Sequence, residues 1–141
     1  KRHREGQDVT LIAIGGILHE VNLASEMLQK IGINARVVGM HTLKPIDKNE
    51  IFDAAKNTGG IVTVEEHNLD GGLGSAVSEV CMDYSIFPKK FLRIGLNNIY
   101  SSIVGSQHYL RSSYGMDSNA IFDKVIALLR WVNDCLIFLF L

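Results

Sequence analysis

One loop holds most of the residues in this sequence whose types and spacing could do chemistry. It combines carboxylates, an imidazole, a hydroxyl and three glycines: Glu65, Glu66, His67, Asp70, Gly71, Gly72, Gly74 and Ser75. A carboxylate beside an imidazole can orient the ring and raise its basicity, as general acid–base catalysis requires. Glycines before a helix N-terminus let an anion approach free backbone N–H groups. These residues are therefore the candidate interdomain or ligand loop.

Each chemical interpretation of this loop has a structural alternative. Side chains alternate along a strand end, so Glu65 and Glu66 should point to opposite faces and at most one can line a given cleft. Salt bridges or contacts with a neighbouring domain are the alternative to catalysis. A dinucleotide fingerprint needs G-x-G-x-x-G or Ala, but Val77 follows Gly72 and Gly74 at the third position. Nearby carboxylates would also repel phosphate, so turn geometry and packing are the default role of the glycines.

The rest of the sequence contains no complete active-site motif. Its other histidines lie too far apart for H-x-H or H-E-x-x-H metal sites: His3, His19, His41 and His108. Cys81 and Cys135 also lack metal-ligand spacing and suit a reduced, intracellular chain. There is no G-x-S-x-G elbow and no phosphate-binding G-x-x-x-x-G-K-[ST] loop. We therefore assign no catalytic, cofactor-binding or metal-binding residue from motifs.

Alternating strand and helix patterns must position this loop. Apolar runs predict strands at 9–14, 35–40, 61–64 and 91–94, the first ending in two glycines. Helices are predicted at 17–31, from about 48 to 58, at 75–84, around 107–113 and from about 120. Asp47 with Glu50 forms an acidic capping box, and Asp117 or Ser118 caps the last helix. This alternation predicts an open α/β sandwich with parallel strands.

Composition predicts one globular domain without a nucleic-acid surface. The 141 residues include 47% hydrophobic and 21% charged residues, with a formal charge of −1. Clustered positive charge, which nucleic-acid binding needs, occurs only at residues 1–4, and these are interpreted as part of a solvated polar tail. The predicted divisions are a tail at 1–8, a domain at 9–128 and an atypical apolar tail at 129–141.

The apolar tail is too short for a membrane anchor. Residues 125–141 are nearly all apolar, but Arg130, Asn133 and Asp134 interrupt them, and a span needs about 20 largely uncharged residues. The polar start has no signal-peptide pattern. We therefore expect a cytoplasmic chain without membrane partners, in which an exposed tail would promote association.

The order of several motifs resembles the C-terminal domain of transketolase-type thiamine diphosphate enzymes. These motifs are DVTLIAIGG, INARVVGMHTLKPID, TGGIVTVEEHNLDGGLGSAVSEV and RIGLNNIYSSIVGSQHYLRSSYGMDSNAI. Each is weak alone, but together they cover about residues 5–128 in the family's order. The resemblance implies a three-layer α/β/α sandwich, with a five-stranded, mostly parallel sheet and one antiparallel edge strand. The tail after Leu128 has no counterpart in the family pattern.

The resemblance also implies that the chemistry lies elsewhere. In this family, other domains hold the cofactor thiamine diphosphate and its Mg²⁺. Their G-D-G motif, followed by paired asparagines, has no counterpart here, and Asn97–Asn98 is interpreted as a turn. The implied partners are the missing diphosphate- and pyrimidine-binding domains, in the same chain or a separate subunit, within a homo- or hetero-oligomer. We expect the isolated chain to bind no cofactor and to be inactive.

The functional prediction is a transketolase-like enzyme that transfers a two-carbon ketol unit between sugar phosphates, with this chain supporting assembly. The β chain of a 2-oxoacid dehydrogenase and deoxyxylulose-phosphate synthase share the domain and remain alternatives. A stand-alone assembly or ligand-binding module is a further alternative. The sequences EEH at 65–67 and YGMD at 114–117 favour transketolase.

Overall fold

The computed structural model describes residues 1–98 and 102–137, and side chains through residue 130. Its strands are β1 (Arg2–Arg4), β2 (Val9–Ile14), β3 (Ala35–Met40), β4 (Ile61–Asn68) and β5 (Phe91–Leu96). They form one sheet in the order β1-β3-β2-β4-β5, in which β1 is antiparallel and the other pairs are parallel. The mostly parallel sheet with one antiparallel edge strand is therefore confirmed.

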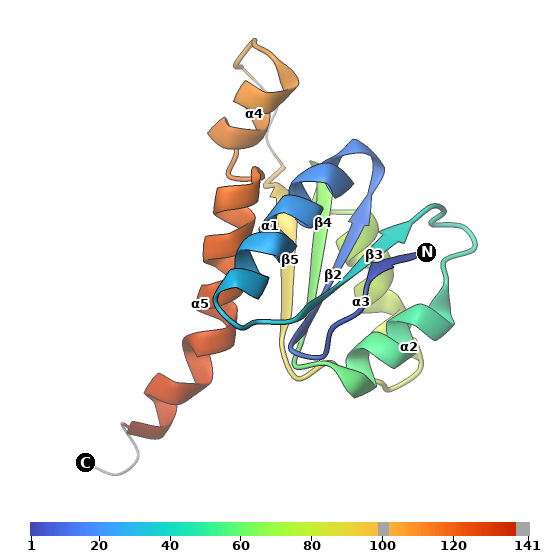
Figure 1. The fold of residues 1–141 in the computed structure, drawn as a ribbon. Helices are drawn as coiled ribbons and strands as arrows, with labels where there is room; N and C mark the ends of the chain where they lie inside the picture. Colours follow the sequence, from blue (N-terminus) through green and yellow to red (C-terminus); the bar gives the residue numbers. More distant parts are fainter. Residues whose placement is uncertain (99–101, 138–141) are drawn as a thin grey trace.

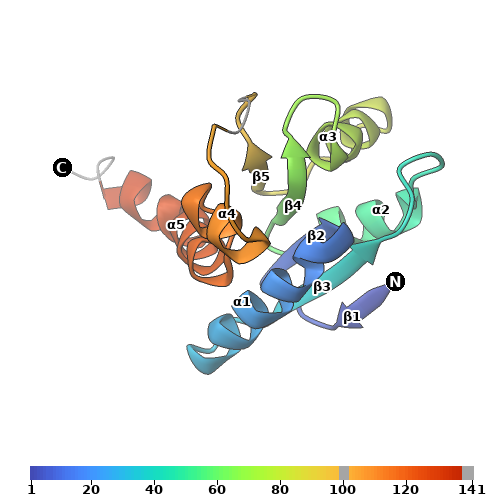
Figure 2. The ribbon, with the colours of Figure 1, turned by 90° about the horizontal axis from the view of Figure 1, so that it is seen from above.

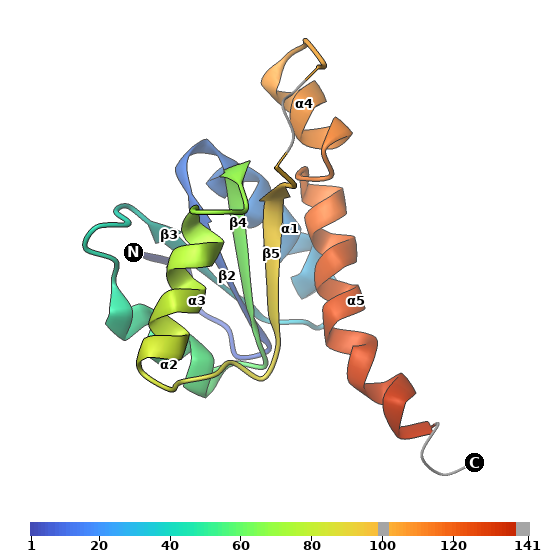
Figure 3. The same cartoon turned by 180° about the vertical axis from the view of Figure 1, so that it is seen from behind.

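Helices cover both faces of this sheet. They are the 3₁₀ turn η1 (Gly15–Ile17), α1 (Leu18–Lys30), α2 (Lys48–Asn57), α3 (Leu73–Asp83), α4 (Gln107–Ser113) and α5 (Ser118–Ile137). Helices α1 and α5 lie on one face, and α2 and α3 on the other (Figures 1 and 2). Helix α4 projects beyond the edge where the parallel strands end, whereas α5 runs past the opposite end (Figure 3). The three-layer sandwich is thus confirmed.

Alternating strand residues divide the core into two clusters. In β2, Val9 and Leu11 pack with the α1 and α5 cluster, whereas Ile12, the next residue along the strand, packs with α2 and α3. All three are fully buried. An apolar run without polar alternation is what a strand covered on both faces requires.

Local signals in the sequence set the helix ends. The Asp47 side chain accepts a hydrogen bond from the Glu50 backbone N–H at 3.1 Å, which starts α2 as predicted. The Asp117 side chain likewise accepts from the Ala120 N–H at 2.9 Å and starts α5. At the end of α1, Gly32 has φ +83°, a left-handed conformation that glycine adopts without strain.

The N-terminal residues correct one prediction. Residues 1–4, expected to be part of a solvated tail, include edge strand β1. The Gly39 N–H donates to the Lys1 carbonyl at 2.9 Å, and the Arg2 Nε donates to Glu50 at 2.8 Å. A three-residue polar strand has too little apolar pattern to be recognised, and the partners that hold it lie far along the chain.

The boundaries around the candidate loop also differ from prediction. Strand β4 was predicted at 61–64 and continues to Asn68, because Asn68 pairs with Leu96 of β5 after an irregularity in the register. Helix α3 was predicted from Ser75 and begins at Leu73. Much of the expected loop therefore belongs to a strand end and a first helical turn.

Helix α5 crosses the predicted boundary between residues 128 and 129 without a break. The Lys90 Nζ, just before β5, donates to the carbonyls of Leu128 and Leu129 at 2.9 and 2.7 Å and ties this part of α5 to the sheet. The predicted exposure of the apolar tail concerns side chains after residue 130, which lie outside the described residues. Within the described part, no helix is long and apolar enough to cross a membrane.

Candidate functional site

The strand order places the candidate site between β2 and β4. The chain leaves β2 toward β3 on one side and later returns to β4 on the other, so the loops at the carboxyl ends of β2 and β4 diverge there. Ligands of open α/β sheets bind at such switch points. The loop after β2 contributes Gly16, and β4 contributes Glu65 and Glu66.

Glu65 is buried beneath the glycine loop. Only 1% of this residue is exposed. Its carboxylate accepts hydrogen bonds from the backbone N–H groups of Leu73 and Gly74, at 2.7 and 2.9 Å. These are first-turn N–H groups of α3, which have no partner within the helix and favour a negative charge. The chain's own carboxylate therefore occupies the position where a phosphate would bind.

Two glycines of the loop, Gly72 and Gly74, lie so close to other side chains that a Cβ would not fit. A Cβ on Gly72 would overlap the Glu65 carboxylate, and a Cβ on Gly74 would lie 2.6 Å from the Arg93 Cδ. Gly71 differs, because its φ of +76° is in the left-handed region and nothing lies near its missing side chain. The default interpretation, turn geometry and packing, accounts for all three positions.

Glu66 points away from Glu65 and pairs with α4. Arg111 donates from Nε and Nη2 to the two Glu66 oxygens at 2.7 and 3.0 Å, and the Gln107 Nε2 donates at 3.1 Å. The hydrogen bonds from Arg111, with its positive charge, lower the pKa of Glu66, and the same pairing raises the pKa of Arg111. The predicted opposite orientation of the two glutamates is confirmed. The structural alternatives to catalysis were a salt bridge or a contact with a neighbouring domain, and the structure shows that Glu66 forms a salt bridge within this chain.

A second carboxylate joins this ion pair. The Glu20 Oε1 lies 3.6 Å from the Arg111 Nη1, and its Oε2 accepts from the Ser118 N–H at 3.0 Å. Both Glu20 and Arg111 are buried. Gly16 lies against the cluster, since a Cβ there would be 3.2 Å from the Arg111 Nη2. The cluster thus joins the ends of β2 and β4 to α1, α4 and the start of α5.

A cleft of about 540 Å³ opens beside this cluster. It is lined by Glu66, Leu96, Gly105, Gln107, Leu110, Arg111, Tyr114 and Met116. The Arg111 guanidinium faces two carboxylates, so the cleft has no surplus positive charge for a phosphate. A carboxylate with a lowered pKa is also a weak base, so Glu66 is poorly suited to accept a proton near pH 7.

The remaining residues of the candidate loop do not converge on this cleft. The His67 Nδ1 lies 2.9 Å from the Asn68 carbonyl oxygen, and the Asp70 carboxylate accepts from the Asn98 amide. The Ser75 hydroxyl donates to the Leu69 carbonyl at 2.8 Å. The structure therefore separates the proposed acid–base group of Glu65, Glu66 and His67 into three environments. In the residues it describes, no cluster of His, Cys, Asp or Glu could hold a metal ion.

Sequence reasoning missed Glu20, Gln107 and Arg111. Helix and strand patterns correctly placed them on helices, but nothing in one sequence pairs positions separated by 45 residues, as Glu66 and Arg111 are. The signal that could have helped was the strand order. Once that order is known, the carboxyl ends of β2 and β4 are expected to lie side by side, and the residues that follow them become candidates for one site.

The fold and this site define a class of domain. It is a doubly wound α/β domain in which the carboxylates at the switch point bind donors on the domain's own helices. The chain belongs to the transketolase C-terminal domain family, whose family model matches residues 1–121. The match includes the residues of β1, in agreement with the edge strand. The resemblance stated from the motifs is therefore confirmed.

Named relatives and a solved structure agree with this assignment. A "Putative transketolase C-terminal section" from Methanocaldococcus jannaschii is 40% identical over 122 residues, covering 86% of this chain and 37% of the relative. A "1-deoxy-D-xylulose-5-phosphate synthase 1" from Geobacter metallireducens is 38% identical over 122 residues, covering 86% of this chain and 19% of the relative. A structure titled "Split gene transketolase, inactive beta4 tetramer" matches with a TM-score of 0.81 and 36% identity, covering 92% of this chain and 42% of that chain. The chain thus spans less than half the length of each.

Proposed function

We propose that this chain is the third domain of a transketolase-type enzyme that transfers a two-carbon ketol unit between sugar phosphates. The observation that carries the proposal is the family match over residues 1–121, in a chain that corresponds to 37% of its M. jannaschii relative. The diphosphate- and pyrimidine-binding domains, with thiamine diphosphate and Mg²⁺, would then belong to a larger remainder of the enzyme. The same proposal includes a cytoplasmic, dimeric or hetero-oligomeric assembly.

The site supports an assembly role over a catalytic one. The Glu65 carboxylate is used by α3, and the Glu66 carboxylate by Arg111 and Gln107. Both carboxylates are already engaged by donors of this chain and are not free to exchange protons with a substrate. Both instead hold the loops at the end of the sheet in place. A rigid edge of this kind is suited to carry a neighbouring domain.

A deoxyxylulose-phosphate synthase is the second candidate. It is favoured by the G. metallireducens relative, which is almost as similar to this chain as the transketolase section. The same domain would have the same assembly role in either enzyme, so the domains that accompany it decide the substrate.

A domain exchange tests the assembly role. The matching domain of the split-gene transketolase chain is replaced by residues 1–130, and the chimaera is mixed with the other product of the split gene. We expect a stable complex with ketol-transfer activity within about tenfold of the native pair, a difference of about 1.4 kcal/mol. The control is the same chain with its C-terminal domain deleted. A chimaera that unfolds cooperatively on heating but forms no complex would refute the assembly role.

A further inference from the structure

Strand β5 forms one lateral edge of the sheet. In the part of the chain that the structure describes, β5 pairs with β4 alone. The carbonyls of Lys90 and Leu96 accept from the β4 side, at 2.9 Å each. Because the backbone groups of successive residues in a strand alternate in direction, those of Phe91, Arg93 and Gly95 face away from β4. Such an edge can bind an extended peptide as one more strand.

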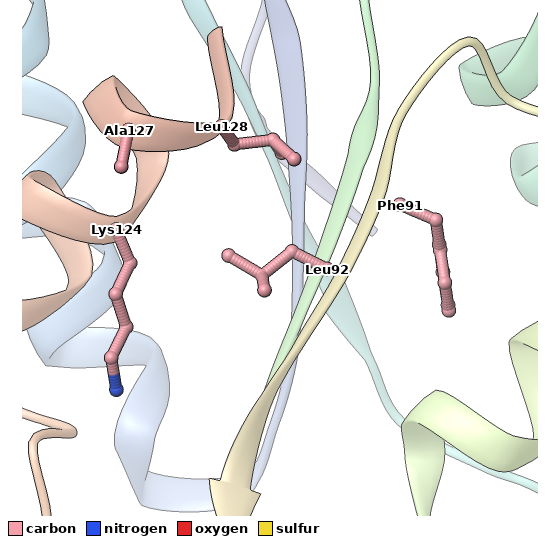
Figure 4. Close-up of a pocket in the computed structure, with 5 residues that line it drawn as sticks. All are labelled: Phe91, Leu92, Lys124, Ala127 and Leu128. Atoms are coloured by element: carbon pink, nitrogen blue, oxygen red, sulfur yellow. The ribbon is translucent and has the colours of Figure 1, made fainter. Parts of the chain in front are cut away.

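Both faces of β5 are hollowed beside this edge. On the α5 face, a groove of about 390 Å³ is lined in part by Leu92 of the strand and Leu128 of α5 (Figure 4). Phe91 points to the opposite side of β5 (Figure 4) and borders a second hollow, of about 300 Å³, against α3. Met82 and Phe87 also line this second hollow, and they are 66% and 61% exposed. Successive side chains of an added strand point to alternate faces, so its apolar side chains would enter both hollows.

Arg93 adds a charge to the same edge, on the same face of the sheet as Phe91. Its Nη1 donates to the Leu69 carbonyl at 3.2 Å and to the Ser75 hydroxyl at 3.4 Å. In the residues that the structure describes, no carboxylate pairs with this guanidinium, whereas the Arg111 guanidinium faces two. A guanidinium binds a carboxylate through paired, charge-assisted hydrogen bonds. An occupant that carries a carboxylate would therefore complement Arg93.

The edge strands of this chain do not provide that carboxylate. Strand β5 reads Phe-Leu-Arg-Ile-Gly-Leu, so the pairing of two β5 edges would bring no acidic side chain to Arg93. The other edge of the sheet, β1, reads Arg-His-Arg, and its pairing with β5 of a second copy would oppose like charges. Charge complementarity therefore favours a segment of a different polypeptide over a second copy of this sheet.

We propose that the β5 edge binds an extended segment of another polypeptide as an added antiparallel strand, the orientation with the more stable backbone pairing. The residues of the occupant that lie opposite Arg93, Leu92 and Phe91 then follow one another in its sequence. They form a motif of one acidic residue and two large apolar residues. The acidic residue pairs with Arg93, and the apolar residues enter the α5-face groove and the α3-face hollow in turn. This inference goes beyond the assembly role proposed above, which concerns the carboxyl end of the sheet.

A synthetic peptide tests the charge and the motif on the full chain. The probe is acetyl-Thr-Val-Glu-Val-Leu-Thr-amide with a fluorescent label, and binding is followed by fluorescence anisotropy. We expect saturable binding with a dissociation constant below about 1 mM, and a loss of at least about tenfold when the probe carries Gln for Glu or the chain carries Arg93→Gln. Lys56→Gln removes the same charge from an exposed position on α2 and is the matched control. Circular dichroism during heating checks that both variants are folded.

Backbone methylation separates strand addition from simple ion pairing. The probe residue opposite Arg93 exchanges backbone hydrogen bonds with it, so a methyl group on the Glu nitrogen should weaken binding by at least about tenfold. The N–H of the next residue, Val, points away from β5, and its methylation should leave binding unchanged. An Arg93→Glu chain should prefer a probe with Lys in place of Glu.

Three results with the probe would overturn the proposal. They are no saturable binding at about 1 mM, equal binding of the Glu and Gln probes, and equal loss from the two methylated probes. A wild-type dimer that the probe dissociates in sedimentation equilibrium would assign the edge to a second copy and would overturn it as well.

Discussion

Glu65 and Glu66 are neighbours with the same functional group and different structural roles. The strand geometry of β4 directs Glu65 under the start of α3 and Glu66 toward Arg111 on α4. In each case hydrogen-bond donors stabilise the carboxylate: first-turn N–H groups of α3 for Glu65, and the Arg111 and Gln107 side chains for Glu66. Single substitutions around these groups should therefore affect stability in distinguishable ways.

Gly72→Val should destabilise the fold by about 1–3 kcal/mol. The new side chain would overlap the Glu65 carboxylate, so either the carboxylate or the first turn of α3 must move. Chemical denaturation measures the change. Gly71→Ala is the comparison, because that position has a left-handed φ but no close neighbour, and a cost of about 1 kcal/mol is expected from the backbone alone. An unchanged midpoint for Gly72→Val would contradict the close-approach argument.

Glu66→Gln should lower stability at pH 7 by about 1–2 kcal/mol. The amide retains an acceptor but loses the charge opposite Arg111; 29% of the Glu66 side chain is exposed, so solvent screens part of the effect.

The same substitution has a predictable pH dependence. The pKa of Glu66 is lowered in the folded chain, so its stabilisation is complete above the unfolded pKa, near 4.3, and is lost as pH falls through the folded value. Urea denaturation from pH 7 to pH 3 should show wild type and Glu66→Gln converging below about pH 4.3. Glu26→Gln, on the exposed Arg4 pair, should match wild type at every pH. A constant gap between wild type and Glu66→Gln would show that the charge of Glu66 does not contribute.

At the scale of elements, β1 is held by charge. Arg2 pairs with Glu50 and Asp53 of α2, and the buried Arg36 of β3 donates to the same Asp53 at 2.7 Å. A short edge strand of three residues gains little from its ladder alone. We therefore expect the ion-pair group to add to the backbone ladder in fixing β1 against β3.

Arg2→Gln should release β1 without unfolding the sheet. The prediction is faster amide hydrogen exchange at Gly39, whose N–H is bonded to the Lys1 carbonyl, and unchanged exchange in β2 and β4. The control is Arg4→Gln, because Arg4 contacts the side chains of Gln29 and Glu26 on α1, outside the ion-pair group. Exchange at Gly39 equal to that of wild type would mean that the ladder holds β1 without Arg2.

Elements with strong local signals were predictable, and those defined by distant partners were not. The apolar run 9–14 and the Asp47 cap gave β2 and the start of α2 because both signals are contained within a few residues. Strand β1 and the extension of β4 to Asn68 depend on neighbours in the sheet. The loop at 65–75 was recognised, but its partner Arg111 was not, since one sequence contains no information on which helix packs over which strand end.

At the scale of the whole molecule, this chain is one domain of a larger catalytic assembly in our proposal. We predict that calorimetric titration with thiamine diphosphate and Mg²⁺ gives no saturable binding, and that a coupled transketolase assay gives no turnover. Mg²⁺ sites combine carboxylate, amide and phosphate oxygens, whereas the carboxylates of Glu20, Glu65 and Glu66 are bound to the chain's own donors. A positive control is the native split-gene transketolase pair. Saturable micromolar binding by this chain alone would place a cofactor site within it.

The carboxylate beneath the glycine loop also has an evolutionary consequence. Position 72 excludes a side chain mainly because the Glu65 carboxylate fills that space, with the Asn68 carbonyl oxygen at 2.9 Å as a lesser contact, so positions 65 and 72 form one unit. Among homologues, glycine at position 72 should accompany glutamate at position 65, and a shorter residue at 65 should appear together with a side chain at 72. The residues at positions 65 and 72 would then covary across an alignment. Their identities would show, in each homologue, how the first turn of α3 is capped, whatever sugar phosphate the whole enzyme uses.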